Sequence, residues 1–277
     1  MAMSGLNVDG KTVVITGGAT GIGFALAKAF GARGARICIG EPRQNRLEEA
    51  VDALHRESIE ADYFVCDVSD PDQVVALADF AFSLGPPVAA IVNNAGIGIG
   101  RGSVIDRDLN ELRRLFDVNF FGVWQGCAVF GKRFIEQGAP AGIYNVGSEN
   151  SLFVGVPNVA GYVSSKHAVH GLTDALRDEL PEFINVGLIC PGFVRSEIID
   201  PSVAPLAMDT DVFADRVVKQ IEAGSFYIVT HAYNKQRIDE RYRELQDAFA
   251  AYAPRYDGDD QYDIRTLLQK MRENKRS

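Results

Sequence analysis

The chain has 277 residues, of which 47% are hydrophobic and 23% charged, and this composition is typical of a globular protein with a sizeable core. Disordered, collagen-like and fibrous classes are excluded. The 28 Lys and Arg residues against 37 Asp and Glu residues give a formal net charge of −9, which disfavours nucleic acid and anionic membrane surfaces as partners.

The N-terminus and the apolar runs predict a soluble, cytoplasmic protein. The N-terminal segment lacks the basic start and the apolar stretch of a secretory signal. No apolar run reaches the roughly 18 residues that a membrane-spanning helix needs. The cysteines lack the spacing of metal ligands, so we expect buried, unreactive thiols and no metal site; they are Cys38, Cys66, Cys127 and Cys190.

Short apolar runs rich in β-branched residues alternate with helical stretches along the chain. We predict seven strands, at residues 12–16, 36–40, 61–66, 89–92, 142–146, 185–190 and 226–230. Because the segments between them are long enough for crossover helices, the strands are expected to be parallel and covered on both faces. The prediction is one doubly wound α/β (Rossmann) domain over residues 1–232, with ligands bound beyond the carboxyl ends of the strands.

The last third of the chain breaks this alternation. Residues 191–215 contain three prolines and predict a mobile loop. From Asn234 onward an apolar stripe at helical spacing predicts a helix; it consists of Ile238, Tyr242, Leu245, Phe249 and Tyr252. We interpret residues 233–277 as a helical extension of the same domain, packed on it by this stripe. An oligomer contact and a cover over the cleft are the alternatives.

A glycine-rich turn follows the first strand and opens a helix. Glycines at this position let a pyrophosphate approach the free amides at the helix N-terminus, where the dipole favours negative charge. The strand before the turn and the helix formers after it match the context that this mechanism requires. We therefore predict a dinucleotide site that includes Gly17, Thr20, Gly21, Ile22 and Gly23.

Carboxylates follow the second and third strands. Glu41 lies 18 positions beyond the glycine turn, close to the place of an acid that binds the adenosine ribose, and it favours NAD. Arg43 and Arg46 offer a rival clamp for the 2′-phosphate of NADP, and Glu41 as a solvated loop acid is a further alternative. Asp67 is predicted to meet the adenine amino group, with capping of the helix after Pro71 as the alternative.

Tyr162 and Lys166 are spaced to share one face of a helix. A tyrosine ionises near pH 10 in water, so a phenol that exchanges protons near neutrality needs a fixed positive neighbour that stabilises the phenolate. Lys166 suits that part. The nearby histidines, His167 and His170, are interpreted as ordinary helix residues.

Further polar residues follow other strands. Asn93-Asn94-Ala95-Gly96 comes after the fourth strand, Ser148 after the fifth and Pro191-Gly192 after the sixth, while Asn119 lies in a helix. Together with the glycine turn and the Tyr162–Lys166 pair, they make the sequence resemble the short-chain dehydrogenase/reductase family over roughly residues 8–230.

The resemblance implies a division of labour among four catalytic residues. Tyr162 would act as the general acid and base. Lys166 would lower the pKa of Tyr162 and hold the nicotinamide ribose, and Ser148 would donate a hydrogen bond to the reacting oxygen. Asn119 would hold a water molecule of a proton relay, with a side chain satisfied by backbone groups as the alternative.

The resemblance also implies which residues line the cofactor. Asn94, Ala95 and Gly96 would support the sheet beside it, and the segment around Pro191 would face the nicotinamide. Besides the glycine turn, the residues assigned to the cofactor are Glu41, Asp67, Val68, Asn94, Ala95, Gly96, Tyr162, Lys166, Pro191, Gly192 and Ser196. Ser196 stands where the family often has Thr.

The sequence departs from the family pattern at one spacing. Ser148 precedes Tyr162 by 14 positions, one more than the family's usual separation, so Ser151 is a rival. We favour Ser148 because it directly follows the strand end, and residues 152–157 can absorb the extra residue.

The expected activity is hydride transfer between a nicotinamide cofactor, with NAD favoured over NADP, and a secondary alcohol or ketone. An apolar lining in the loops predicts aromatic, alicyclic or steroid-like substrates; it consists of Ile97, Phe153, Val154, Val156 and Phe193. Polar contacts are expected from Glu149, Asn150 and Asn158. A non-catalytic dinucleotide-sensing protein and an NAD-dependent epimerase are the alternatives. The resemblance further implies a homodimer or homotetramer built on residues 108–137 and 162–180.

Overall fold

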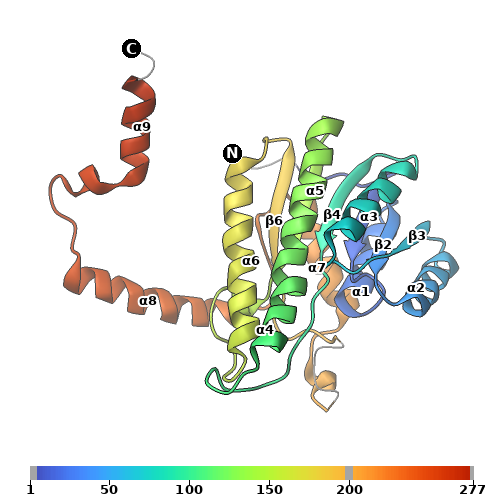
Figure 1. Ribbon diagram of the computed structural model, residues 1–277, viewed down its shortest axis with the longest axis horizontal. Coiled ribbons are helices and arrows are strands. Elements are labelled where there is room, and N and C mark those ends of the chain that lie inside the picture. Colours follow the sequence, from blue (N-terminus) through green and yellow to red (C-terminus); the bar gives the residue numbers. More distant parts are fainter. Residues whose placement is uncertain (1–4, 197–201, 275–277) are drawn as a thin grey trace. The chain divides into compact units, whose positions relative to one another are not determined.

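A parallel seven-stranded sheet forms the centre of the chain in the computed structural model, which describes residues 5–196 and 202–274. The strand order is β3-β2-β1-β4-β5-β6-β7, and Figure 1 labels β3, β2, β4 and β6 in that order across the sheet. The strands are β1 (Thr12–Thr16), β2 (Arg36–Glu41), β3 (Ala61–Val65), β4 (Val88–Asn93), β5 (Ala141–Val146), β6 (Ile184–Cys190) and β7 (Tyr227–Val229). The predicted Rossmann sheet is confirmed, and each strand ends within one residue of its predicted bound.

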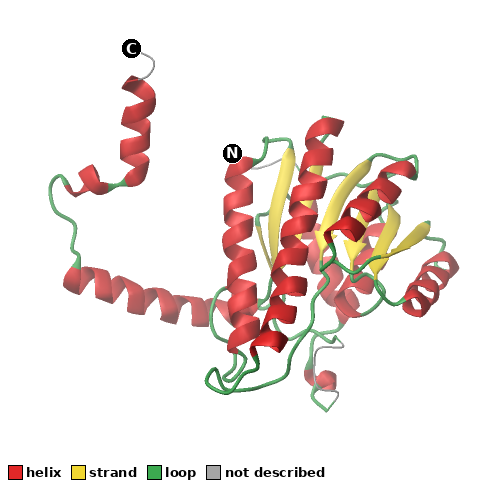
Figure 2. Cartoon of the chain, viewed as in Figure 1, coloured by secondary structure: helices red, strands yellow, loops and turns green. Residues whose placement is uncertain are grey.

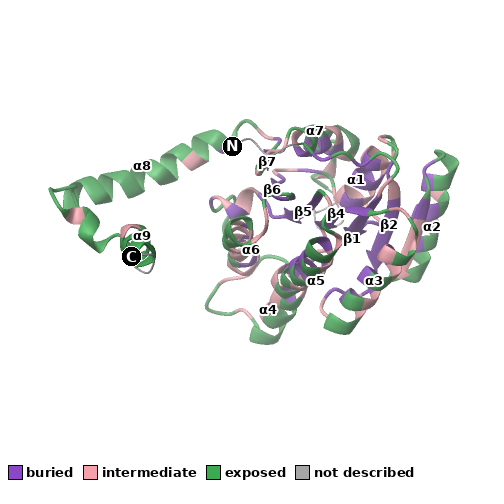
Figure 3. Cartoon of the chain, turned by 90° about the horizontal axis from the view of Figure 1, so that it is seen from above, coloured by how far each residue is buried: buried purple, intermediate pink, exposed green. Residues whose placement is uncertain are grey.

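Helices cover both faces of the sheet, as Figure 2 shows. One layer holds α1 (Gly21–Gly31), α2 (Gln44–Arg56) and α7 (Thr210–Glu222), and the other holds α3 (Pro71–Ser83), α5 (Gly122–Gln137) and α6 (Ala160–Glu179). Between β4 and α5 run α4 (Leu109–Phe116) and a π-helical turn, Asp117–Phe121. Figure 3 shows the sheet between the two helix layers.

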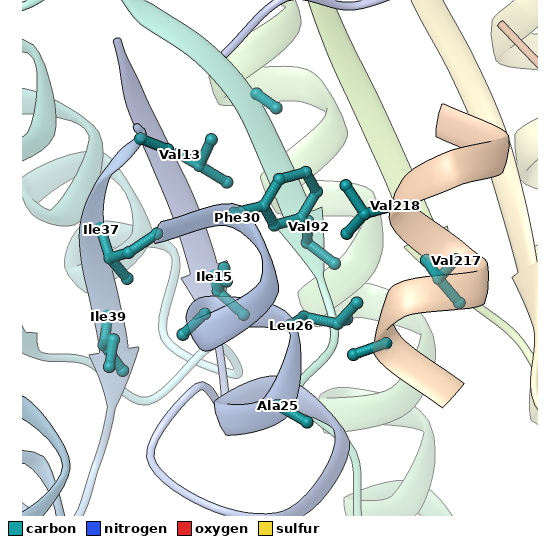
Figure 4. Close-up of a cluster of buried hydrophobic side chains, with 14 of the residues drawn as sticks. Val13, Ile15, Ala25, Leu26, Phe30, Ile37, Ile39, Val92, Val217 and Val218 are labelled. Carbon is teal, nitrogen blue, oxygen red and sulfur yellow. The ribbon is translucent and has the colours of Figure 1, made fainter. Parts of the chain in front are cut away.

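Buried aliphatic side chains fill the space between the sheet and each layer. In Figure 4, Leu26 and Phe30 of α1 meet Val217 and Val218 of α7 over the central strands. The strands read as continuous apolar runs because a parallel sheet is buried on both faces. This core fixes the carboxyl ends of β1 and β4, where the strand order reverses and where ligands bind in sheets of this kind.

The predicted loop at residues 191–215 ends too late, because a helix already begins at Thr210. A short helical turn lies at Ala204–Leu206, and α7 begins at Thr210, where the Asp209 carboxylate accepts hydrogen bonds from the Asp211 and Val212 backbone N–H groups. The three prolines led to the prediction of a loop up to residue 215, although Asp209 is a typical N-cap residue that indicates a helix start. The stretch 197–201 lies outside the described residues.

The chain divides into two compact units, residues 1–234 and 235–277. The predicted helix after β7 is present as α8 (Asn234–Tyr252), and its stripe is exposed from Tyr242 onward, with Tyr242 at 57% and Phe249 at 59%, while Ile238 is intermediate. A further helix, α9 (Ile264–Asn274), had no counterpart in the prediction. The packing of the stripe and the assignment of this unit to the parent domain stay predictions. Within the described ranges, no helix has the length and apolarity needed to cross a membrane.

Candidate functional site

The glycine turn is fastened to the end of β4. The Asn94 side-chain amide donates hydrogen bonds to the main-chain oxygens of Thr16 and Gly17, over 2.9 and 3.0 Å. In return, Thr16 Oγ1 accepts from the backbone N–H groups of Asn94 and Ala95, over 3.0 and 3.1 Å. Gly17 has a φ of 62°, a conformation that favours glycine. The turn therefore has one fixed shape at the point where β1 and β4 diverge.

The first turn of α1 follows directly. The backbone N–H groups of Gly21, Ile22 and Gly23 lie in that turn, where no intrahelical partner exists for them, and Thr20 is the N-cap residue. Ser196 lies beside this turn, because a Cβ built on Gly21 would stand 3.6 Å from its Cα and Cβ atoms. The structure thus brings the predicted pyrophosphate turn and the end of the predicted nicotinamide segment together.

Glu41 closes β2 as a buried carboxylate. It is 5% exposed and accepts a hydrogen bond from Arg43 Nε over 2.6 Å. The alternative of a solvated loop acid is therefore wrong. The predicted clamp of Arg43 and Arg46 for a 2′-phosphate would place that phosphate beside the Glu41 carboxylate, to which Arg43 is bound.

Asp67 shapes the loop after β3. Its Oδ1 accepts hydrogen bonds from the Ser69 backbone N–H over 2.9 Å and from the Ser69 hydroxyl over 2.7 Å. Capping of α3 falls to Asp70, whose carboxylate accepts from the Asp72 backbone N–H, so the alternative for Asp67 is wrong. Val68 is buried against α5. Contact of this loop with adenine stays a prediction.

The loop after β5 separates the two candidate serines. Ser148 is 7% exposed, and its hydroxyl lies near enough to the Tyr162 phenol to lower the pKa of that phenol. The same hydroxyl caps the short turn Glu149–Ser151, where it accepts a hydrogen bond from the Asn150 backbone N–H over 3.1 Å. Ser151 faces the helix instead: its hydroxyl donates to the Lys166 carbonyl over 2.8 Å and accepts from the Ser148 backbone N–H over 3.1 Å. Ser148, and not Ser151, is therefore the serine beside the phenol, while absorption of the longer spacing by residues 152–157 stays a prediction.

Tyr162 and Lys166 lie on one face of α6, with the ammonium 5.7 Å from the centroid of the phenol ring. Burial lowers the pKa of Lys166 to about 8, so the side chain is a cation at neutral pH, and Nζ donates to the Val146 carbonyl over 2.8 Å. The pKa of Tyr162 lies above its ordinary value, because burial outweighs the lowering by Ser148 and the Glu149 charge raises the pKa further. A lowering of this pKa by Lys166 stays a prediction.

Asn119 sits in the π-helical turn and is fully buried. Its Oδ1 accepts from the Ile97 backbone N–H over 2.8 Å, and its Nδ2 donates to the Ile97 carbonyl over 3.0 Å. A Cβ on Gly96 would lie 3.4 Å from Asn119 Oδ1 and 3.8 Å from Lys166 Nζ. The backbone-satisfied alternative describes this amide, and any water would use its second N–H bond or second lone pair.

A buried polar chain holds α6 against the sheet. Asn93 Nδ2 donates to Asn145 Oδ1 over 2.8 Å, and Asn145 Nδ2 donates to Thr173 Oγ1 over 3.0 Å. Such a chain joins the ends of β4 and β5 to the helix that carries Tyr162 and Lys166. Sequence reasoning gave neither Asn145 nor Thr173 a part in the site, because the contact spans three elements.

The sequence also gave no part to His231 and Tyr233, which follow β7. They lie against Pro191, Gly192 and Phe193 after β6. The signal was available, since both residues come just after a strand end, where functional side chains are expected.

The expected apolar lining lies on several loops and differs in exposure. Phe153 is 7% exposed and belongs to the core, whereas Val154 and Val156 are 65% and 41% exposed. Ile97 and Phe193 are intermediate. The four cysteines are buried, and burial raises the pKa of each thiol to about 12, as expected for unreactive side chains.

Known proteins are similar in sequence to this chain over most of its length. A family model described as short chain dehydrogenase matches residues 11–206. The chain is 30% identical to a 1-deoxy-11-beta-hydroxypentalenate dehydrogenase of Streptomyces avermitilis over 251 residues, which make up 87% of this chain and 92% of the relative. It is 33% identical to zerumbone synthase of Zingiber zerumbet over 208 residues, 74% of this chain and 77% of the relative.

Solved structures share the fold as well. A short chain dehydrogenase/reductase from Burkholderia phymatum, in complex with NAD, superposes with a TM-score of 0.81 at 28% identity. The match covers 87% of this chain and 95% of that chain.

Proposed function

This chain belongs to the short-chain dehydrogenase/reductase family, and we propose that Ser148, Tyr162 and Lys166 carry its hydride-transfer reaction. It is an oxidoreductase that acts on CH–OH groups with NAD or NADP. The observation that carries the proposal is the arrangement around the Tyr162 phenol. Ser148 lies close enough to lower the pKa of this phenol, and the Lys166 ammonium lies one helical turn away.

The chemistry follows from the movement of charge. A nicotinamide cofactor bound at this site would supply the hydride chemistry between the carbinol carbon of the alcohol and the carbonyl carbon of the ketone. In oxidation, the Tyr162 phenolate takes the hydroxyl proton, and the Lys166 cation favours that phenolate. In reduction, the phenol donates the proton to the nascent alkoxide while Ser148 hydrogen-bonds the same oxygen. Asn119 would support this relay from the π-helical turn.

The cofactor would lie across the carboxyl ends of the strands. The residues present fit it: the first turn of α1 offers backbone N–H groups for a pyrophosphate, and Glu41 offers a carboxylate for ribose hydroxyls. Asn94, Ala95 and Gly96 would pass beside it, and the segment from Pro191 to Ser196 would face the nicotinamide.

An apolar secondary alcohol or ketone is the substrate class that we favour, with an aromatic, alicyclic or steroid-like skeleton. The exposed Val154 and Val156 follow Ser148 in sequence. Covering such side chains with an apolar ligand removes apolar area from water, which favours binding. The hydroxypentalenate dehydrogenase of Streptomyces avermitilis, by its name, acts on a hydroxylated compound, which agrees with this class.

A panel of secondary alcohols and ketones tests the function through the absorbance of reduced nicotinamide. We expect turnover with cyclic or aromatic members, measured as NADH formed or consumed. Cofactor binding without turnover across the panel would favour a dinucleotide-sensing protein. Substrate conversion without net NADH would favour an epimerase.

We propose NAD as the preferred cofactor because a buried Glu41 carboxylate repels a 2′-phosphate. Dissociation constants for NAD and NADP, measured on the wild type and on Glu41→Ala, test this. The variant should bind NAD about ten-fold more weakly, as expected for one lost charge-assisted hydrogen-bond partner, and NADP no more weakly than the wild type. A wild type that binds NADP more tightly than NAD would contradict the preference.

Ser148→Ala should lower kcat by about 100-fold to 1,000-fold, the usual cost of removing one donor to the reacting oxygen. Because the Ser148 hydrogen bond lowers the pKa of Tyr162, its loss raises that pKa. Alcohol oxidation needs the phenolate, so the rise of kcat/KM with pH should move to higher pH. Ser151→Ala should lower the thermal midpoint without moving this limb; the opposite result would make Ser151 the catalytic serine.

We propose a homodimer or homotetramer assembled through residues 108–137 and 162–180. Large apolar side chains around the start of α5 are exposed, with Phe121 at 49% and Trp124 at 52%. Their area favours contact with a second copy. Sedimentation of the purified chain measures the assembly, and a monomer at all concentrations would contradict it.

A further inference from the structure

Tyr233, in the loop after β7, joins two other loops of the site through its hydroxyl group. The phenol donates a hydrogen bond to Glu149 Oε2 over 2.6 Å and accepts one from the Phe193 backbone N–H over 3.3 Å. Glu149 directly follows Ser148, and its own backbone N–H donates to the Pro191 carbonyl over 2.7 Å. These hydrogen bonds form a closed ring through the loops after β5, β6 and β7.

His231 holds the same segment from its other side. The Gly192 backbone N–H donates to His231 Nδ1 over 3.2 Å, which requires that Nδ1 carries no proton. Burial lowers the pKa of His231, and this favours the neutral ring that the bond needs. A Cβ on Gly192 would lie 2.6 Å from His231 Cγ and 2.7 Å from the Tyr233 hydroxyl oxygen, so only glycine permits this approach.

The loop after β7, which carries His231 and Tyr233, is itself held by hydrogen bonds. Arg216 of α7 donates to the Thr230 carbonyl over 3.0 Å, and the Thr230 hydroxyl lies 2.8 Å from His231 Nδ1. Tyr233 therefore presents its hydroxyl from a fixed base. This matters because hydrogen bonds position a neighbouring segment only when their own donor is held.

We propose that Tyr233 is a positioning residue for hydride transfer, which holds the Pro191–Phe193 backbone at a fixed place relative to Ser148. The inference rests on the proposed function, because that function places the nicotinamide against the Pro191–Phe193 segment and the reacting oxygen against Ser148. A displacement of about 1 Å between reacting groups can cost about 100-fold in rate. The ring of hydrogen bonds removes that freedom before the substrate binds.

Tyr233→Phe tests the proposal because it removes only the oxygen that closes the ring. We expect kcat to fall about ten-fold on the high-pH plateau, the effect of one lost charge-assisted hydrogen bond. KM should stay close to the wild type, and the thermal midpoint should fall by only a few degrees, as one lost hydrogen bond predicts. A matched control is Tyr63→Phe on β3, whose phenol lies 3.5 Å from Glu48 Oε1 as another Tyr–Glu pair, and it should leave kcat unchanged.

Variants of Glu149 distinguish positioning from mere structural support. Glu149→Gln keeps an oxygen that accepts from Tyr233, so its kcat on the plateau should fall less than that of Glu149→Leu. Glu149→Leu loses the acceptor and should match Tyr233→Phe. The double variant Tyr233→Phe/Glu149→Leu should be no slower than either single variant, because both changes break the same ring.

Three results would overturn the inference: wild-type kcat in Tyr233→Phe, additive losses in the double variant, or a loss confined to the thermal midpoint. None of them bears on the proposed function, which fails instead if Tyr162→Phe retains turnover. The two failures are therefore distinguishable on one set of purified proteins.

Discussion

Tyr162→Phe is expected to lower kcat by about 100-fold to 10,000-fold, the range that general acid–base catalysis supplies. The change removes the hydroxyl whose pKa Ser148 lowers and keeps the ring that lies 5.7 Å from the Lys166 ammonium. Cofactor affinity should stay nearly intact, because the predicted pyrophosphate turn lies on β1 and α1 and is untouched. Steady-state kinetics and NADH titration by fluorescence measure the two quantities separately.

The pH profile sharpens this test. Wild-type alcohol oxidation should rise with pH as the phenol loses its proton, and the limb should vanish in Tyr162→Phe because no phenol titrates there. Tyr242→Phe in α8 is the matched control, since it deletes the same atom from a side chain that is 57% exposed in the other unit, and kcat should not change. Unchanged turnover in Tyr162→Phe would reject the proton-transfer role.

The strands could be read from the sequence because burial on both faces of a parallel sheet produces continuous β-branched runs. Helix boundaries were less legible. The helix α7 starts inside a segment that proline made look irregular, although its buried positions repeat at helical spacing from Phe213 to Ile221. The helix α9 has apolar residues at Ile264, Leu267, Leu268 and Met271, a spacing that predicts it, but the polar surroundings masked the pattern.

Some residues of the site could be predicted from their spacing in the sequence, whereas contacts between residues distant in the sequence could not. Tyr162 and Lys166 are four positions apart, so helical geometry alone places them together. The choice between Ser148 and Ser151 needed the structure, because only the direction of each hydroxyl separates them. The contact of His231 with Gly192 joins residues far apart in the chain, and no periodicity encodes such a pairing.

Gly23→Ala is expected to weaken cofactor binding strongly, because the added methyl group has no room in the turn. Its Cβ would lie 2.4 Å from the Gly17 carbonyl oxygen and 2.5 Å from Asn94 Nδ2. Relief requires the backbone of the turn to open and Asn94 to leave it. Overpacking of this kind costs about 1–3 kcal/mol, which corresponds to a loss of about five-fold to 150-fold in NADH affinity if the binding conformation bears the strain.

Gly171→Ala in α6 is the matched control for Gly23→Ala. A Cβ at Gly171 meets open space, and alanine in a helix interior should raise the free energy of unfolding by about 0.5–1 kcal/mol without changing NADH affinity. Because Gly23→Ala also lowers the thermal midpoint, NADH titration belongs well below that midpoint, with circular dichroism to establish the folded fraction. A fully folded Gly23→Ala that binds NADH as the wild type does would mean that the cofactor's pyrophosphate lies elsewhere, since the turn cannot accept the methyl group and keep its shape.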